Sequence, residues 1–202
     1  AKSNEITAIP KLLEMLDLRG ATITIDAMGC QRRIVDTIVG RGANYVIAVK
    51  DNQPSLRAEI EAAFATSEIA NERLPPSGRY ESLERAHGRV EQRCVLALDV
   101  AERLGERQTW TSLRSIVLVD SERTVGGKTS HETRYYISSL PPDAAELAAA
   151  IRGHWGIENQ QHWTLDMTFN EDRSRSRKGN APDNFAVLRR IALNLLKLDK
   201  SK

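Results

Sequence analysis

The sequence predicts an α/β fold with a β-rich, antiparallel insertion. Between residues 4 and 52, apolar stripes at helical spacing alternate with short β-branched runs. This alternation favours parallel strands joined by crossover helices. From about residue 80 to residue 140, strand-like segments are instead separated by turn signals. Helical spacing returns after Asp143, and no internal repeat interrupts the order.

The first part of the predicted core, residues 1–75, begins with a helix. Asn4 is a candidate N-cap, apolar residues follow at helical spacing, and Gly20 ends the helix. The β-branched run at residues 21–29 predicts a buried strand that ends at Asp26. A second helix, a second buried strand and a third helix are predicted at residues 32–39, 44–52 and 54–64.

The insertion is predicted at residues 76–141, after a polar, proline-rich boundary. Its strand-like segments are residues 80–100, 112–124 and 131–140. The last part of the core, residues 142–202, is predicted to hold a helix from Asp143 to Met167, a basic loop at residues 171–184 and an amphipathic helix at residues 185–198.

Charge and composition exclude several classes of protein. The net charge is +2, which excludes a polybasic coat protein, although residues 173–202 carry nine basic and two acidic side chains. A basic end suggests a polyanionic partner, and a solvated helix surface is the alternative. No apolar run approaches the roughly 20 residues of a membrane span. Two widely spaced cysteines fit a reducing cytoplasm and exclude a cysteine zinc cluster.

Asp26 is the first candidate site residue, because it ends a predicted buried strand beside the small residues Ala27 and Gly29. Ligand-binding and catalytic groups gather at the carboxyl ends of strands in open α/β sheets. An acid that caps the next helix is an equally good interpretation of the same pattern.

The segment RGHWGIENQQHW supplies the second candidate. His154, Glu158 and His162 recur every four residues and therefore share one helix face. Trp155, Asn159 and Trp163 form a neighbouring stripe, which core packing of a partly buried helix would also explain. A single zinc ion bound by both histidines is disfavoured, since residues eight apart on a straight helix are separated by about 12 Å.

With these residues in place, the sequence resembles the insertion-sequence transposases of the H-repeat-associated (Rhs-element) type. The matching segments cover nearly the whole chain and are NEITAIPKLLEMLDLRGATITIDAMGCQ, YVIAVKDNQP, HGRVEQR, RYYISSL and IRGHWGIENQQHWTLDMTFNEDRSRSRKGNAPDNFAVLRRIALNLLK.

The resemblance implies a ribonuclease-H-like fold with a DDE site of two aspartates and one glutamate. Asp26 corresponds to the second aspartate and Glu158 to the glutamate, and the β-rich stretch corresponds to an insertion before the glutamate helix. The first aspartate lies upstream in the family and has no counterpart here. We therefore expect an incomplete core whose first strands are absent, either as a truncated gene product or as an excised fragment.

The resemblance also implies metal-assisted phosphoryl transfer on DNA. Three carboxylates would hold two Mg²⁺ or Mn²⁺ ions, which hard oxygen ligands suit. His154, Asn159 and His162 are expected to support the metal ligands. The expected contacts to transposon-end and target DNA are Arg152, Arg173, Arg175, Arg177, Lys178, His87 and Arg89. His87 has a β-turn as its alternative role, and Trp155 and Trp163 have core packing or stacking on a terminal base.

Three functional hypotheses follow. The first is a bacterial cytoplasmic DNA transposase that is a homo-oligomer when active. The second is a catalytically inactive fragment that binds DNA or associates with an intact transposase. The third is another ribonuclease-H-like nuclease such as a junction resolvase, against which the insertion and the HWGIENQQHW segment argue.

Overall fold

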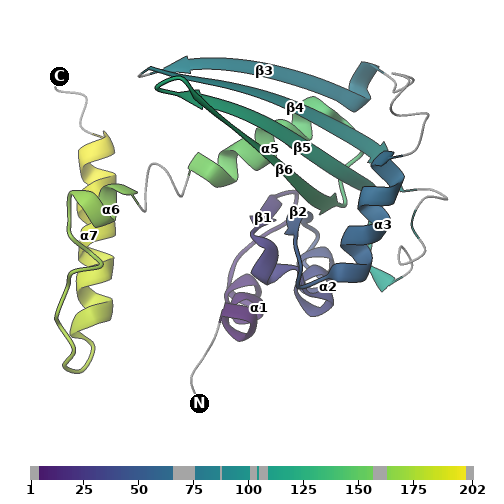
Figure 1. The fold of residues 1–202 in the computed structure, drawn as a ribbon. Coiled ribbons are helices and arrows are strands. Elements are labelled where there is room, and N and C mark those ends of the chain that lie inside the picture. The colour runs from purple at the N-terminus through teal and green to yellow at the C-terminus, as the bar shows by residue number, and fades with distance from the viewer. Residues whose placement is uncertain are drawn as a thin grey trace. The chain divides into compact units, whose positions relative to one another are not determined.

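The computed structural model describes residues 5–65, 76–86, 88–100, 104, 109–156 and 163–198. The chain divides into two compact units, residues 1–151 and residues 152–202. Figure 1 shows their elements.

Unit 1 is built on one six-stranded sheet, with the strand order β1-β2-β6-β5-β4-β3. Its strands are β1 (Thr22–Ile25), β2 (Asn44–Val49), β3 (Arg79–Ala86), β4 (Arg89–Asp99), β5 (Ser115–Val125) and β6 (Lys128–Ser138). Its helices are α1 (Glu5–Met15), α2 (Arg32–Gly40), α3 (Pro54–Ala65) and α5 (Ala144–Gly156), whose last turn belongs to unit 2. Two short 3-10 helices, η1 (Ala27–Gly29) and η2 (Pro76–Gly78), complete the set.

The predicted parallel pair is confirmed. β1 runs parallel to β2, with Ile25 opposite Ile47, and α2 connects the two strands. A parallel pair needs a crossover of this kind, because the chain must return to the same end of the sheet. The α/β start of the chain thus follows from its alternating pattern.

The β-rich stretch is antiparallel, as predicted. β3, β4, β5 and β6 pair in turn as neighbours, and β6 also pairs antiparallel with β2. The stretch therefore continues the sheet of β1 and β2. Two glycines with positive φ, Gly126 and Gly127, form the turn between β5 and β6, where residues with a Cβ are strained.

One face of this sheet holds the main core. Tyr45, Ile47, Ile116 and Ile137 are fully buried on it, together with apolar residues of α1, α2 and α3. These side chains alternate along their strands with residues of the other face, as the period of a strand requires. Helices α1, α2 and α3 thus cover one face of the base of the sheet.

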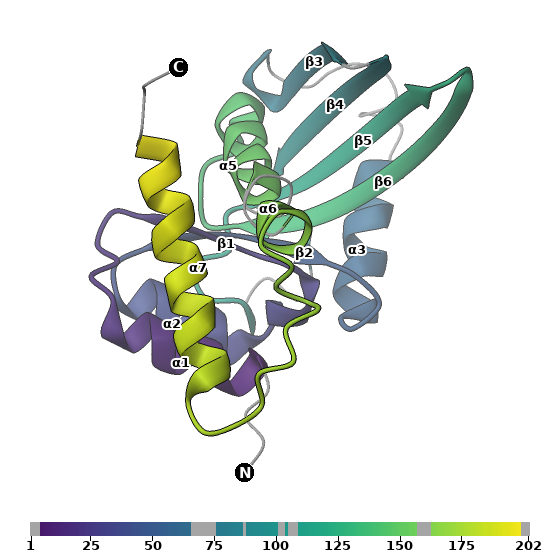
Figure 2. The ribbon, with the colours of Figure 1, turned by 90° about the vertical axis from the view of Figure 1, so that its left-hand side faces the viewer.

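The part of α5 that belongs to unit 1 covers the other face. Figures 1 and 2 place it on the side of the sheet opposite to α3. Ala144, Leu147 and Ile151 are buried on this helix. Asp143 caps its start as predicted, because its Oδ1 accepts hydrogen bonds of 3.0 Å from the backbone N–H groups of Ala145 and Glu146.

Unit 2 contains α6 (Trp163–Met167) and α7 (Ala181–Leu198). The last helix begins four residues earlier than predicted, because Pro182 lies in its first turn, where a missing N–H costs nothing. Residues 157–162 of the predicted helix 143–167 lie outside the described residues. None of the helices in the described part combines the length and hydropathy that a membrane crossing requires.

The core face generates a first prediction. Ile116→Ala in β5 removes a side chain with no exposed surface, and the cavity left behind should lower the free energy of unfolding by about 2–5 kcal/mol. Val125→Ala, at the outer end of the same strand where the side chain is 45% exposed, should cost less than about 1 kcal/mol. Urea denaturation followed by circular dichroism measures both values. Equal losses would show that β5 is not anchored as described.

Candidate functional site

Asp26 lies at the carboxyl end of β1, as the sequence predicts, but it is exposed. Its backbone is extended (φ −69°, ψ 177°), and the chain then turns directly into η1. The carboxylate therefore needs no buried counter-charge. The expected cost of burying an acid at the end of an apolar strand does not arise here.

One oxygen of Asp26 is used to hold the turn. Oδ1 accepts hydrogen bonds from the backbone N–H groups of Met28 at 3.1 Å and Gly29 at 3.4 Å. Asp26 is thus the N-cap of η1, which is the capping role that the sequence left open. Within the described residues Oδ2 has no hydrogen-bond partner, so this oxygen remains available to a ligand.

Two amide side chains of the segment that follows β2 hold the turn after Asp26 by hydrogen bonds. Asn52 Nδ2 donates to the carbonyl oxygen of Ala27 at 2.7 Å, and Gln53 Nε2 donates to that of Cys30 at 2.8 Å. Gly29 lies against Ile25, since a Cβ at Gly29 would come within 2.2 Å of Ile25 Cγ2. These contacts set the direction in which the Asp26 carboxylate points.

Cys30 closes the turn and is not a nucleophile. Its side chain is fully buried, and burial raises the pKa of the thiol to about 12. The reactive thiolate is therefore absent near neutral pH. The role of Cys30 is to pack in the core beneath the Asp26 turn.

Continued by one residue through the extended backbone of Asp26, the alternation of β1 assigns Asp26 to the face opposite the main core. Ile25 pairs with Ile47 and packs on the core side, so Asp26, the next residue, belongs to the other face. Tyr136 of β6, which pairs with Ala48, lies on that same face. Asp26 therefore shares its face with α5.

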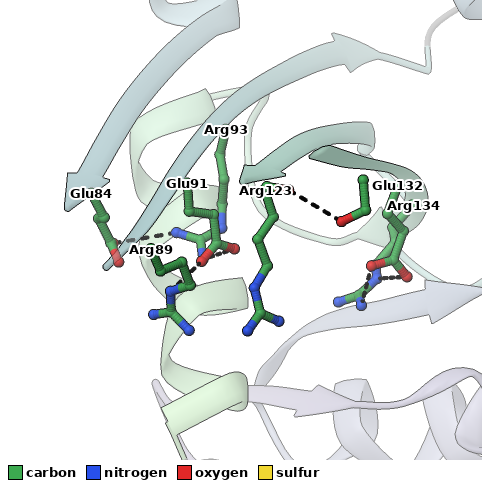
Figure 3. Close-up of polar contacts among 8 residues, drawn as sticks. Glu84, Arg89, Glu91, Arg93, Arg123, Glu132 and Arg134 are labelled. Carbon is green, nitrogen blue, oxygen red and sulfur yellow. Dashed lines mark hydrogen bonds and ion pairs between the residues drawn. The ribbon is translucent and has the colours of Figure 1, made fainter. Parts of the chain in front are cut away.

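Beyond the end of β2, the outer parts of β3 to β6 carry an ion-pair cluster on this same face. Arg93 donates to Glu84 Oε1 at 3.3 Å and also to Glu91 Oε1. Arg89, a predicted DNA contact, lies at the start of β4, where its Nε is 3.6 Å from Glu91 Oε2. Figure 3 shows this cluster with its neighbours on β5 and β6.

Two further predicted residues lie on the last turn of α5. His154 and Trp155 are half-buried, and their rings meet edge to face with centroids 6.3 Å apart. Arg152 is exposed on the same turn. The predicted residues Glu158, Asn159, His162 and His87 lie outside the described residues. The placement of Glu158 relative to Asp26 therefore stays a prediction.

A basic loop connects α6 to α7. Its basic residues Arg173, Arg175, Arg177 and Lys178 are exposed and form no ion pair with another described residue of the chain. The half-buried Ser174 and Ser176 alternate with the three arginines. Glu171, at the start of the loop, lies 3.9 Å from Arg189 of α7. The loop thus presents uncompensated positive charge.

Sequence reasoning missed two features of this region. The amides of Asn52 and Gln53 hold the Asp26 turn, and the only signal in the sequence is the polar run that follows the second predicted strand. Arg93, Arg123 and Arg134 join Arg89 on one face through the pairing of the strands. Alternation within each strand, combined with hairpin turns at Gly88 and Gly126, could have found them.

Comparison with known proteins decides the family. The family model described as "Transposase DDE domain" matches residues 1–195. The chain belongs to this family. Among its curated relatives in Escherichia coli strain K12 are a putative protein YbfL, 43% identical over 98% of this chain, and an H repeat-associated putative transposase YhhI, 42% identical over 98% of it.

A third relative, a putative transposase YncI of Escherichia coli O157:H7, is 42% identical over 98% of the chain. The aligned part makes up 53%, 53% and 51% of these three relatives, so the chain spans about half their length. The resemblance to H-repeat-associated transposases is confirmed.

The hydrogen bonds from Asn52 and Gln53 to the turn after Asp26 generate a second prediction. Asn52→Ala removes the hydrogen bond to Ala27 and should lower the free energy of unfolding by about 1 kcal/mol. Lys50→Ala, an exposed neighbour, should change it by less than about 0.5 kcal/mol. Chemical denaturation of both variants makes the comparison. A loss for Asn52→Ala no larger than for the control would mean that this amide does not hold the turn.

Proposed function

We propose that these residues belong to a DNA transposase that cleaves and transfers DNA strands at a DDE site, with Asp26 as the second aspartate and Glu158 as the glutamate. The observation that carries the proposal is the geometry of Asp26 in a chain of the transposase DDE family. Its exposed carboxylate ends β1 with Oδ1 held by the turn and Oδ2 without a partner among the described residues. Such a group is oriented before any ligand arrives.

The donor chemistry fits a hard divalent cation. A carboxylate oxygen suits Mg²⁺ or Mn²⁺, and the family typically uses such ions. Within the described residues no group of three histidine, cysteine, aspartate or glutamate side chains is close enough to hold a metal ion. Asp26 and Glu158 are therefore proposed as two ligands of a shared site to which a third carboxylate contributes. The bound ions would supply Lewis acidity at the phosphoryl group.

The residues of the chain supply orientation. The Asp26 carboxylate is held at the end of β1 through Oδ1, which accepts from the Met28 and Gly29 amides, while Asn52 and Gln53 hold the turn itself. A ribonuclease-H-like core would bring the glutamate helix to the face of the sheet on which Asp26 lies. His154, Asn159 and His162 then support Glu158 from the same helix, as outer ligands that fix a carboxylate do.

Contacts to DNA are proposed for the basic residues. Arg173, Arg175, Arg177 and Lys178 provide charge without an acidic partner among the described residues, which phosphates can neutralise. Arg152, Arg89 and His87 are proposed as further contacts to transposon ends. The active form is proposed to be a homo-oligomer in the bacterial cytoplasm.

A second candidate function is DNA binding without cleavage. The observation that favours it is the exposed basic loop, whose Arg173, Arg175, Arg177 and Lys178 form no ion pair with another described residue. With this function, the chain would bind DNA or associate with an intact transposase. Gel-shift and cleavage assays on the 202 residues separate the two functions, because binding without strand scission supports the second.

The site assignment gives a third prediction. Asp26→Asn and Glu158→Gln keep the shape of each side chain and remove its charge. In the longest gene product that contains these residues, each should lower Mg²⁺-dependent cleavage of a transposon-end duplex at least about 100-fold, because a metal ligand is removed. Asp17→Asn is the matched control, since Asp17 is an exposed acid that pairs with Arg19.

Cleavage is measured by the appearance of the nicked strand on a denaturing gel. Wild-type rates in Asp26→Asn or Glu158→Gln would remove that residue from the site. Loss in Asp17→Asn as well would show that folding rather than chemistry was affected.

The basic loop gives a fourth prediction. A variant with Arg173, Arg175, Arg177 and Lys178 all changed to alanine should bind duplex DNA more weakly at every sequence. The slope of log affinity against log salt concentration should fall by about 0.9 for each phosphate that these side chains neutralise. Fluorescence anisotropy at a series of KCl concentrations measures the slope. An unchanged slope would exclude the loop from the DNA interface.

A further inference from the structure

We infer that the outer parts of β3 to β6 bind the phosphate backbone of duplex DNA beside the cleavage site, with Arg123 as the principal contact. The inference rests on the proposed function, because it extends the DNA path away from Asp26. The surface involved is named here the arginine face, and its basic residues are Arg89, Arg93, Arg123, Lys128 and Arg134.

The strand register brings these residues to one face. Arg123 of β5 is opposite Glu91 of β4 and Ser130 of β6, while Arg134 is opposite Val119. Alternation then gives the arginine face five basic side chains against three acidic ones, which are Glu84, Glu91 and Glu132. The opposite face of the same outer segments carries Arg79 and Arg85 against Glu81, Asp120 and Glu122. Positive charge therefore collects on one side only.

The acidic residues of the arginine face are already engaged. Glu84 and Glu91 both pair with Arg93, whose side chain is 18% exposed. Glu132 accepts two hydrogen bonds of 2.7 Å from Arg134. Arg123 and Lys128 are exposed and form no ion pair with any other described residue. Figure 3 shows Arg89, Arg123 and Arg134 pointing to the same side of the sheet.

A paired strand also limits the motion of Arg123. Its carbonyl oxygen accepts a hydrogen bond of 3.3 Å from Ser130 Oγ, and ladders hold β5 on both sides. A guanidinium on a rigid element loses less conformational entropy on binding than one on a loop. Its planar fork matches two phosphate oxygens. Arg123 is therefore prepared to bind a phosphate, whereas Arg93 is committed to the protein.

The position of Arg123 relative to Asp26 indicates which part of the DNA it contacts. Both belong to the same face of the sheet, and Arg134 lies just beyond the end of β2, where Val49 pairs with Tyr135. Strand spacing and rise place Arg123 three strands across and about six residues outward, or roughly 25 Å from Asp26. That distance corresponds to about seven base pairs of duplex. Arg123 would thus bind DNA that flanks the cut.

The side chains of the arginine face favour a duplex over a single strand. Proteins that bind single strands interleave basic residues with aromatic rings on which bases stack. Outward of the row that holds Val95, Val119 and Arg134, the described face consists of charged residues, serines, alanine and valine. The exposed Tyr80 lies opposite Val95 in that row, so one aromatic ring stands at the inner edge of the face, on the edge strand β3. Contacts from such a face reach phosphates and carry no base readout.

The test measures the binding of a fluorescent duplex of about 20 base pairs to the 202-residue chain by anisotropy, in EDTA so that no cleavage occurs. Arg123→Ala should weaken binding roughly fivefold at moderate salt and reduce the salt slope by about 0.9. Arg123→Lys should keep the slope because the charge remains. Arg85→Ala is the matched control, since Arg85 is an exposed arginine on the opposite face of β3.

The outcomes separate this inference from the site assignment. Binding by Arg123→Ala with the affinity and slope of Arg85→Ala would overturn the arginine face and leave Asp26 and Glu158 untouched. Failure of the wild-type chain to bind the duplex would also overturn it. Asp26→Asn should bind normally in EDTA, because Asp26 is proposed to act through a metal ion. Thermal unfolding of each variant by circular dichroism verifies that the fold is retained.

Discussion

The pairing of β2 with β6 is the constraint on which the other features of unit 1 depend. It joins the parallel pair to the antiparallel strands, and buried hydroxyls fix it at one end. Ser138 Oγ donates to the carbonyl oxygen of Tyr45 at 2.8 Å and accepts from the N–H of Leu140 at 2.9 Å. Ser115 Oγ donates to the carbonyl oxygen of Leu140 at 2.8 Å. A hydroxyl buried without such partners would be costly, so any other register is disfavoured.

Because of this register, the two faces of the sheet have different chemistry. The core face takes the large apolar side chains and α1, α2 and α3. The other face takes Asp26, α5 and the arginine face. Side chains alternate between the two faces along each strand, so every strand contributes residues to both faces. The alignment between neighbouring strands then decides whether apolar residues share one face and charged residues the other. The same physical rule thus builds the hydrophobic core and concentrates positive charge on the side of the proposed site.

The sequence predicted what local patterns determine. Alternating segments predicted the parallel pair, turn signals predicted antiparallel strands, and Asp143 was recognised as a cap. Asp26 was correctly placed at a strand end, yet its exposure and its hydrogen bonds to Met28 and Gly29 depend on how the chain folds back after the strand. Contacts between distant segments, such as Asn52 with Ala27 or Arg123 with its neighbours, have no local signal. The helix α7 begins at Ala181, inside the predicted basic loop, because Pro182 is favoured in the first turn of a helix.

The asymmetry between the two ends of the β5–β6 hairpin has a consequence for how such proteins can diverge. Its tip, Gly126-Gly127, has open space around both glycines, so the hairpin can be lengthened or shortened there by residue pairs without moving its root. A single residue gained or lost between Arg134 and Ser138 is a different event. It would turn every outer side chain of β6 to the opposite face, exchanging Arg134 and Glu132 for Thr133 and His131. Natural variation in hairpin length is therefore expected at the tip, in steps of two.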